Sequence, residues 1–144
     1  MTTTVRDMLV GKTAIHAVEP GVTVFDALRV MATHNIGAVL VSEGSRLVGI
    51  FSERDYARKV ALLGKASRDL AVSEVMTSDV VTVAPWWTAD QCMALMTERR
   101  VRHLPVFDGD RLVGLVSIGD VVRAVLAEQQ RTIEELEHYI TSGG

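Results

Sequence analysis

An internal repeat constrains the fold of this chain more than any other feature of its sequence. The segment Arg46–Ser52 matches Arg111–Ser117 when the chain is shifted against itself by 65 residues. The same shift aligns a further series of identical residues: Pro20 with Pro85, Thr23 with Thr88, Met31 with Met96, Asp55 with Asp120 and Arg58 with Arg123. A series of matches kept in one register indicates a duplication, in which each copy is one supersecondary unit.

Both copies show the same order of secondary-structure signals. Thr23 and Thr88 are predicted N-caps of helices whose apolar residues recur at spacings of three and four. Each helix leads to two short apolar runs around a polar turn that contains glycine, which is the signal of a β-hairpin. Ser52 and Ser117 then begin further helices. The predicted elements are first strands near 14–18 and 80–83, helices over 24–34 and 89–99, and strands over 38–41, 47–51, 104–107 and 112–116.

These elements predict an α/β (α+β-like) fold made of two β-α-β-β-α repeats. A repeat of roughly 65 residues buries little core alone, so we expect the two to pack about a pseudo-two-fold axis with clefts between them. The predicted limits are 5–64 for the first repeat, 72–127 for the second and 128–141 for a C-terminal helix. That helix carries Ile133, Leu136 and Ile140 on one stripe, which could pack on its own domain or form a dimer contact.

Composition and charge argue against several classes of protein. The net charge is only −3 and there is no run of Lys or Arg, so nucleic acid is not an expected partner. The first residues lack the apolar region of a signal peptide, and no apolar stretch is long enough for a membrane helix. The single cysteine, Cys92, fits a reducing compartment and a place in the core. We therefore expect a cytoplasmic protein without a membrane partner.

Each copy carries the spacing Ser-x-x-Asp at the start of its last predicted helix. A serine N-cap leaves backbone N–H groups at a helix start, where a phosphate can bind. An aspartate three residues later could accept hydrogen bonds from a ribose diol. The alternative is a capping box that only stabilises the helix, although Asp is less suited than Glu or Gln to reach back in that motif.

These features together resemble a known family. The segments Gly49–Asp55 and Gly114–Asp120, with Arg102–Val106, are similar to the signatures of the tandem cystathionine-β-synthase (CBS) domain, or Bateman module. The resemblance extends over about residues 5–126. It implies a regulatory homodimer that binds AMP, ADP, ATP, NAD(H) or S-adenosyl ligands in two clefts between the repeats.

The resemblance also implies which residues form the two sites. Each site would take Ser and Asp from one repeat and adenine-facing strand residues from the other. The first set is Ser117 and Asp120 with Thr13, Ile15, His16, Ile36, Gly37 and Ala38. The second set is Ser52, Arg54 and Asp55 with Ser78, Val80, Val81, Val101, Arg102 and His103. Because Arg102 and His103 make the second set more cationic, we expect it to prefer the more phosphorylated ligand.

Other chemistry finds little support in the sequence. The four histidines lack metal-binding spacing, and no nucleophile lies in a catalytic motif, so we expect neither a catalytic cofactor nor an enzyme. Trp86 and Trp87 could anchor a loop or form an oligomer contact. The predicted function is an adenine-nucleotide sensor that signals to an unidentified regulated protein by a change of shape. The alternative is a dimerisation or interaction module that needs no ligand.

Overall fold

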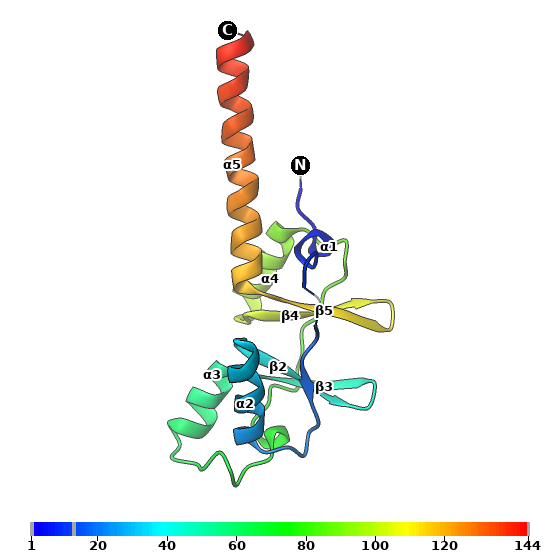
Figure 1. Cartoon of the computed structure of the whole chain (residues 1–144), viewed down its shortest axis with the longest axis vertical. Helices are drawn as coiled ribbons and strands as arrows, with labels where there is room; N and C mark the ends of the chain where they lie inside the picture. Colours follow the sequence, from blue (N-terminus) through cyan, green and yellow to red (C-terminus); the bar gives the residue numbers. More distant parts are fainter. Residues whose placement is uncertain (1, 13, 144) are drawn as a thin grey trace. The chain divides into compact units, whose positions relative to one another are not determined.

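The computed structural model describes residues 2–12 and 14–143, and these form two compact units. Unit 1 comprises Met1–Thr13 and Val81–Gly144, and unit 2 comprises Ala14–Val80. Most helices and strands of each unit are labelled in Figure 1. The predicted limits 5–64 and 72–127 follow the sequence repeat, whereas the compact units do not. The first segment of each sequence repeat packs in the unit built from the other repeat.

Unit 2 contains a small three-stranded sheet. One helix precedes its β-hairpin in the sequence, and three short helical segments follow it. The sheet has the order β1-β2-β3, with β1 parallel to β2 and β2 antiparallel to β3. Its elements are β1 (Ala17–Val18), α2 (Val24–His34), β2 (Ala38–Glu43), β3 (Arg46–Ser52), α3 (Glu53–Tyr56), the π-helical turn η1 (Ala57–Ala61) and the 3-10 helix η2 (Val72–Glu74).

Unit 1 repeats this plan with a shorter sheet. Its two strands β4 and β5 are antiparallel, and the first strand predicted near 80–83 is reduced to one parallel bridge between Val83 and Val106. The elements are α1 (Val5–Met8), α4 (Ala89–Arg99), β4 (His103–Asp108), β5 (Arg111–Ser117) and α5 (Ile118–Gly143). The predicted α/β fold of two repeated units is confirmed.

The capping signals place the two long predicted helices at their observed bounds. Thr23 accepts a hydrogen bond from Asp26 N–H, and Thr88 accepts one from Gln91 N–H, each at 3.1 Å. Both helices end in a residue of left-handed backbone conformation, which satisfies the last carbonyls.

The predicted C-terminal helix over 128–141 is present, but it begins ten residues earlier than predicted. One uninterrupted helix, α5, runs from Ile118 to Gly143. No proline or glycine interrupts it between Val121 and Thr141, and Ala, Leu, Glu, Gln and Arg propagate a helix well. The second repeat therefore continues directly into the terminal helix.

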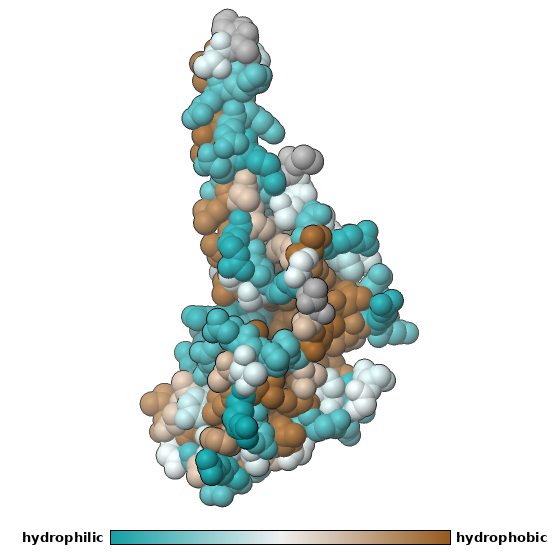
Figure 2. All heavy atoms as spheres, viewed as in Figure 1, coloured by the Kyte–Doolittle hydropathy of each residue, from teal (hydrophilic) through white to brown (hydrophobic). Residues whose placement is uncertain are grey.

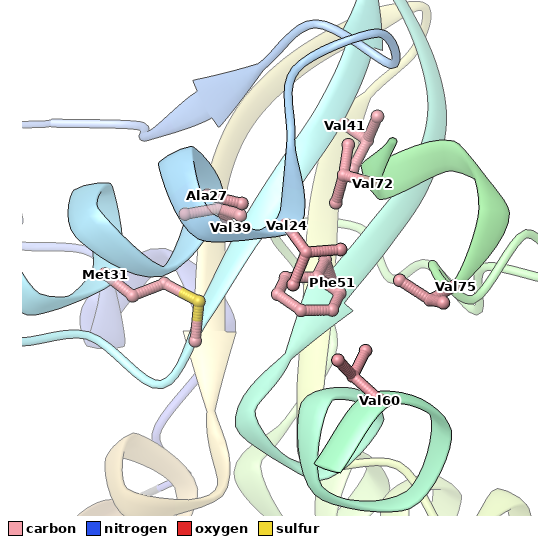
Figure 3. Close-up of a cluster of buried hydrophobic side chains, with 9 residues drawn as sticks. All are labelled: Val24, Ala27, Met31, Val39, Val41, Phe51, Val60, Val72 and Val75. Carbon is pink, nitrogen blue, oxygen red and sulfur yellow. The ribbon is translucent and has the colours of Figure 1, made fainter. Parts of the chain in front are cut away.

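Each unit has its own hydrophobic core, and each core includes the exchanged first segment. In unit 2, Val72 and Val75 lie with Phe51 and Val24 in the cluster drawn in Figure 3. In unit 1, Val5 of α1 is fully buried in the corresponding cluster. Cys92 lies in the same cluster, as predicted, and burial raises the pKa of its thiol to about 11.

A glycine in the last strand of each unit makes room for the exchanged segment. A Cβ at Gly49 would lie 2.5 Å from Met76 Sδ, and one at Gly114 would lie 2.6 Å from Leu9 Cδ2. Beside Gly49, Ile50 and Thr77 exchange backbone hydrogen bonds of 2.9 and 2.8 Å. The glycine of each Gly-x-x-Ser-x-x-Asp signature is therefore a packing requirement of the fold.

This packing predicts unequal costs for two equivalent substitutions. Gly49→Ala should destabilise by about 1–3 kcal/mol because its Cβ also meets the rigid Thr77 carbonyl at 3.0 Å. Gly114→Ala should cost less, since its close contacts are all with the Leu9 side chain, which can move. Urea denaturation measures both, with Gly21→Ala as control because nothing lies within 4 Å of its Cβ position. A Gly49→Ala variant as stable as the control would contradict this account.

Candidate functional site

The Ser-x-x-Asp motif forms a complete capping box at the start of α3. Asp55 N–H donates to Ser52 Oγ at 3.2 Å. In return, Asp55 Oδ2 accepts from Ser52 N–H at 3.0 Å and from Ser52 Oγ at 3.1 Å. The expectation that aspartate is poorly suited to this motif was wrong, because its carboxylate reaches the N-cap amide here.

The same box closes the start of α5. Asp120 N–H donates to Ser117 Oγ at 3.2 Å, and Ser117 N–H donates to Asp120 Oδ2 at 2.8 Å. The stabilising role that the sequence left as an alternative is therefore present in both repeats. It orients both carboxylates without excluding a second role for them.

The second carboxylate oxygen of Asp55 is held by unit 2 itself. Thr77 Oγ donates to Asp55 Oδ1 at 3.1 Å, and Lys59 Nζ lies 3.0 Å from the same atom. Lys59 also donates to the Val75 carbonyl at 3.1 Å. Asp55 is the buried charged residue of the described chain, and these donors offset the cost of its burial.

Asp120 has a different and more cationic set of partners. Lys12 Nζ lies 2.5 Å from Oδ2 and also donates to the Leu115 carbonyl at 2.8 Å. Arg123 donates to Oδ1 at 2.8 Å. Burial by itself would raise the pKa of Asp120, but the hydrogen bonds from Lys12 and Ser117, with the charge of Lys12, outweigh it and lower that pKa.

Four of these partners, Lys12, Lys59, Thr77 and Arg123, were not among the residues predicted from the sequence. Lys59 and Arg123 could have been found, because they follow their aspartates by four and three residues on a helix. Lys12 and Thr77 could not, since they come from the exchanged first segments, which only the tertiary structure brings to the aspartates.

The helix starts offer fewer free amides than the sequence suggested. Glu53 N–H donates to the Gly37 carbonyl at 3.0 Å, and Ile118 N–H donates to the Arg102 carbonyl at 2.8 Å. Together with the capping boxes, these bonds engage three amides at each helix start: those of the N-cap residue, the first helical residue and the third helical residue. Only the amide of the second helical residue, Arg54 or Gly119, is not used by these contacts.

The predicted site residues are divided between the two units. Unit 2 holds Ile15, His16, Ile36, Gly37, Ala38, Ser52, Arg54, Asp55, Ser78 and Val80. Unit 1 holds Val81, Val101, Arg102, His103, Ser117 and Asp120, and Thr13 lies outside the described residues. Each predicted set draws on both units, so its assembly into a site stays a prediction.

Two residues of the first set differ from the simple expectation of an apolar adenine face. The Ala38 side chain is buried in its own unit, so only its main chain could face a ligand. The His16 ring stacks on that of His34, with ring centroids 3.8 Å apart. Partial burial and the neighbouring His34 lower the pKa of His16, which favours its neutral form.

Other predicted features have clear positions. Trp87 packs against the core of unit 1 and its carbonyl accepts a 2.7 Å bond from Val5, while Trp86 is exposed. Within residues 2–12 and 14–143, no three His, Cys, Asp or Glu side chains gather to hold a metal ion. The helices of that same part of the chain include none with the length and apolarity needed to cross a membrane.

Comparison with known proteins agrees with this architecture. The family model for the CBS domain matches residues 5–62 and 72–127. The chain is 42% identical over 126 residues to the CBS domain-containing protein CBSX3, mitochondrial, of Arabidopsis thaliana, covering 84% of this chain. It spans 61% of the length of that relative.

Solved structures show the same fold. A protein with CBS domains from Burkholderia ambifaria MC40-6 superposes with a TM-score of 0.84 at 49% identity, over 88% of this chain and 96% of the other. The CBS domain pair of protein MJ0100, in complex with 5′-methylthioadenosine and S-adenosyl-L-methionine, gives 0.77 at 25% identity, over 89% and 99%. The duplicated signature, the two repeated units and these similarities together place the chain in the CBS domain family, as a tandem pair of CBS repeats.

Proposed function

We propose that this CBS pair is a regulatory module that binds adenine nucleotides, AMP, ADP, ATP or NAD(H), and signals by a conformational change without catalysis. The observation that carries the proposal is that the Ser-x-x-Asp motif is intact at both helix starts, Ser52–Asp55 and Ser117–Asp120. Each presents a carboxylate that is already oriented by its capping box and paired with the ammonium group of a partly exposed lysine. The adenosine-containing ligands of the MJ0100 pair support the same ligand class.

An exchange of partners at each aspartate would admit the ligand. The side chains of Lys12 and Lys59 are partly exposed and end flexible stems, so each ammonium could leave its carboxylate. A ribose hydroxyl would then donate to the oxygen that the lysine leaves, which is Oδ1 of Asp55 or Oδ2 of Asp120. The released ammonium would remain close enough to meet a phosphate, which keeps the local charge balanced.

The two repeats should not bind equally. Asp55 is engaged by Thr77 and Lys59, whereas Asp120 is engaged by Lys12 and Arg123. The strand residues also differ, since Gly37 in one repeat corresponds to Arg102 in the other. The free energy needed to displace the present partners of the two aspartates should differ, and so does the charge of the strand residues. These differences favour two sites with different affinities and different phosphate preferences.

The signal requires only that the ligand bind two states of the pair with different affinity. An unidentified regulated protein would read that change. The competing function is an interaction or dimerisation module without a ligand. It is favoured by the completeness of the capping boxes, because both aspartates already have a structural role.

A ligand panel separates these functions. Thermal unfolding with AMP, ADP, ATP, NADH and S-adenosylmethionine should show stabilisation of about 2.7 kcal/mol for a ligand at 100 times its dissociation constant. Asp55→Asn and Asp120→Asn should each reduce that shift. Asp26→Asn is the matched control, since Asp26 follows its own N-cap Thr23 by three residues but is exposed and outside the signatures. The absence of a shift with every ligand would refute the sensor and leave the interaction module.

Titration calorimetry tests the inequality of the sites. Wild-type protein should show two binding steps, and Asp55→Asn and Asp120→Asn should each weaken a different one. Two binding steps of equal affinity, or loss of the same step in both variants, would show that the differences between the Asp55 and Asp120 motifs do not affect binding.

The lowered pKa of Asp120 predicts a dependence of stability on pH. Folding lowers the pKa of the Asp120 carboxyl below its usual value of 3.8. The contribution of this carboxylate to the free energy of unfolding is therefore fully present above pH 3.8. It is lost as the pH falls through the lower folded-state value. The stability difference between wild type and Asp120→Asn should therefore shrink as the pH is lowered from 7 to below 4 in urea titrations. A difference that stays constant would show that the Lys12 pairing does not act on folding.

A further inference from the structure

The second half of α5 carries an apolar stripe that its own unit does not cover. Every described residue from 129 to 141 is exposed. The stripe consists of Val122, Leu126, Ile133, Leu136 and Ile140, which are 38 to 69% exposed. Figure 2 shows apolar atoms along one edge of this helix and hydrophilic atoms over much of its visible surface. Packing on its own domain, one of the two roles that the sequence left open, does not account for the stripe.

The stripe is distinct from the face by which α5 packs in unit 1. Val121 and Ala124 are buried in that unit. On the same side, Glu128 accepts a hydrogen bond from Thr3 N–H, and Arg131 donates to Thr3 Oγ at 3.2 Å. The helix therefore has one apolar face inside its unit and a second that faces outward.

The spacing of the outward face is that of a coiled-coil seam. With Gln129 included, the stripe positions are 122, 126, 129, 133, 136 and 140, so the steps alternate between four and three residues. This is the a/d pattern by which two helices interlock. At 1.5 Å per residue the seam is about 27 Å long.

We propose that α5 pairs in antiparallel orientation with α5 of a second copy of this chain. In that arrangement the seam is symmetric about residue 131. Val122 lies opposite Ile140 of the second copy, Leu126 opposite its Leu136, and Gln129 opposite its Ile133. One surface thus serves both partners, as a two-fold interface requires.

The charges beside the seam select the second copy and its direction. The outer half of α5 is acidic, with Glu134, Glu135 and Glu137, and its last turn has no basic residue. A parallel pair would place these acidic halves side by side. An antiparallel pair brings Glu137 within two residues of the position opposite Arg123 of the second copy, on the same side of the seam. The Arg123 side chain is largely exposed, and its pairing with Asp120 leaves further N–H donors. The helix dipoles also favour this direction.

The interface is tested first by mass. Sedimentation equilibrium of the full chain should show that Ile133→Glu/Leu136→Glu halves the assembly, with unchanged circular dichroism. The matched control is Leu62→Glu/Leu63→Glu, because these leucines are 79 and 62% exposed but lie outside α5. This control should keep the wild-type mass. An α5 variant that associates as tightly as wild type would overturn the proposal.

The direction is tested by spin labels at Gln130→Cys and, in a separate protein, Thr141→Cys. Cys92 is fully buried, so its thiol should not react. An antiparallel pair brings the two copies of position 130 together but separates the copies of position 141 by about 30 Å, or 20 residues along the helix. Short distances at both positions would mean a parallel pair, and no coupling at either would mean no α5 pairing. Both results contradict the proposal.

Neither test depends on the proposed ligand. Both are performed without nucleotide, and the seam contains no residue of the predicted sites. Nucleotide-dependent stabilisation should persist in Ile133→Glu/Leu136→Glu. A protein that fails to bind any nucleotide but still pairs through α5 would therefore separate the two proposals.

Discussion

The fold depends on the packing of each repeat's first segment in the unit built from the other repeat. Val5 and Val72 are fully buried in these exchanged positions, and burial of such side chains contributes about 1.5–3 kcal/mol each. The close approach is possible because Gly49 and Gly114 present no Cβ to Met76 and Leu9. Neither unit has a complete core without residues from both repeats, so the duplication is a structural requirement as well as a record of the chain's origin.

The same exchange supplies hydrogen-bonding partners to Asp55 and Asp120 at the two Ser-x-x-Asp helix starts. Lys12 and Thr77 reach Asp120 and Asp55 because they lie in the exchanged segments. The capping boxes fix the direction of each carboxylate, and the added donors neutralise its charge. In the proposed function, the same carboxylate that stabilises a helix start also accepts hydrogen bonds from the ligand. Stability and the proposed binding therefore use the same atoms, and binding would require the partly exposed Lys12 and Lys59 to leave the carboxylates.

The helix α5 connects the Ser117–Asp120 capping box to the exposed apolar stripe on its second half. It begins at the Ser117–Asp120 box and continues without interruption beyond the last contacts that hold it to unit 1. Its buried face is short and its exposed face is long, so most of its apolar side chains lie on surface that the described part of the chain leaves uncovered. A helix of this kind gains most of its stability from packing, which makes a partner helix its natural complement.

The sequence by itself determined the duplication, the repeated helices and hairpins, and the motif glycines and capping serines, because periodicity and capping are local properties. The bounds of the helices over 24–34 and 89–99 follow directly from Thr23 and Thr88. Only the tertiary structure decided that the first segments exchange units, that Lys12 and Thr77 engage the aspartates, and that one face of α5 stays uncovered by its own unit. Those outcomes depend on contacts between residues far apart in the chain, as between Lys12 and Asp120, and no local pattern encodes them.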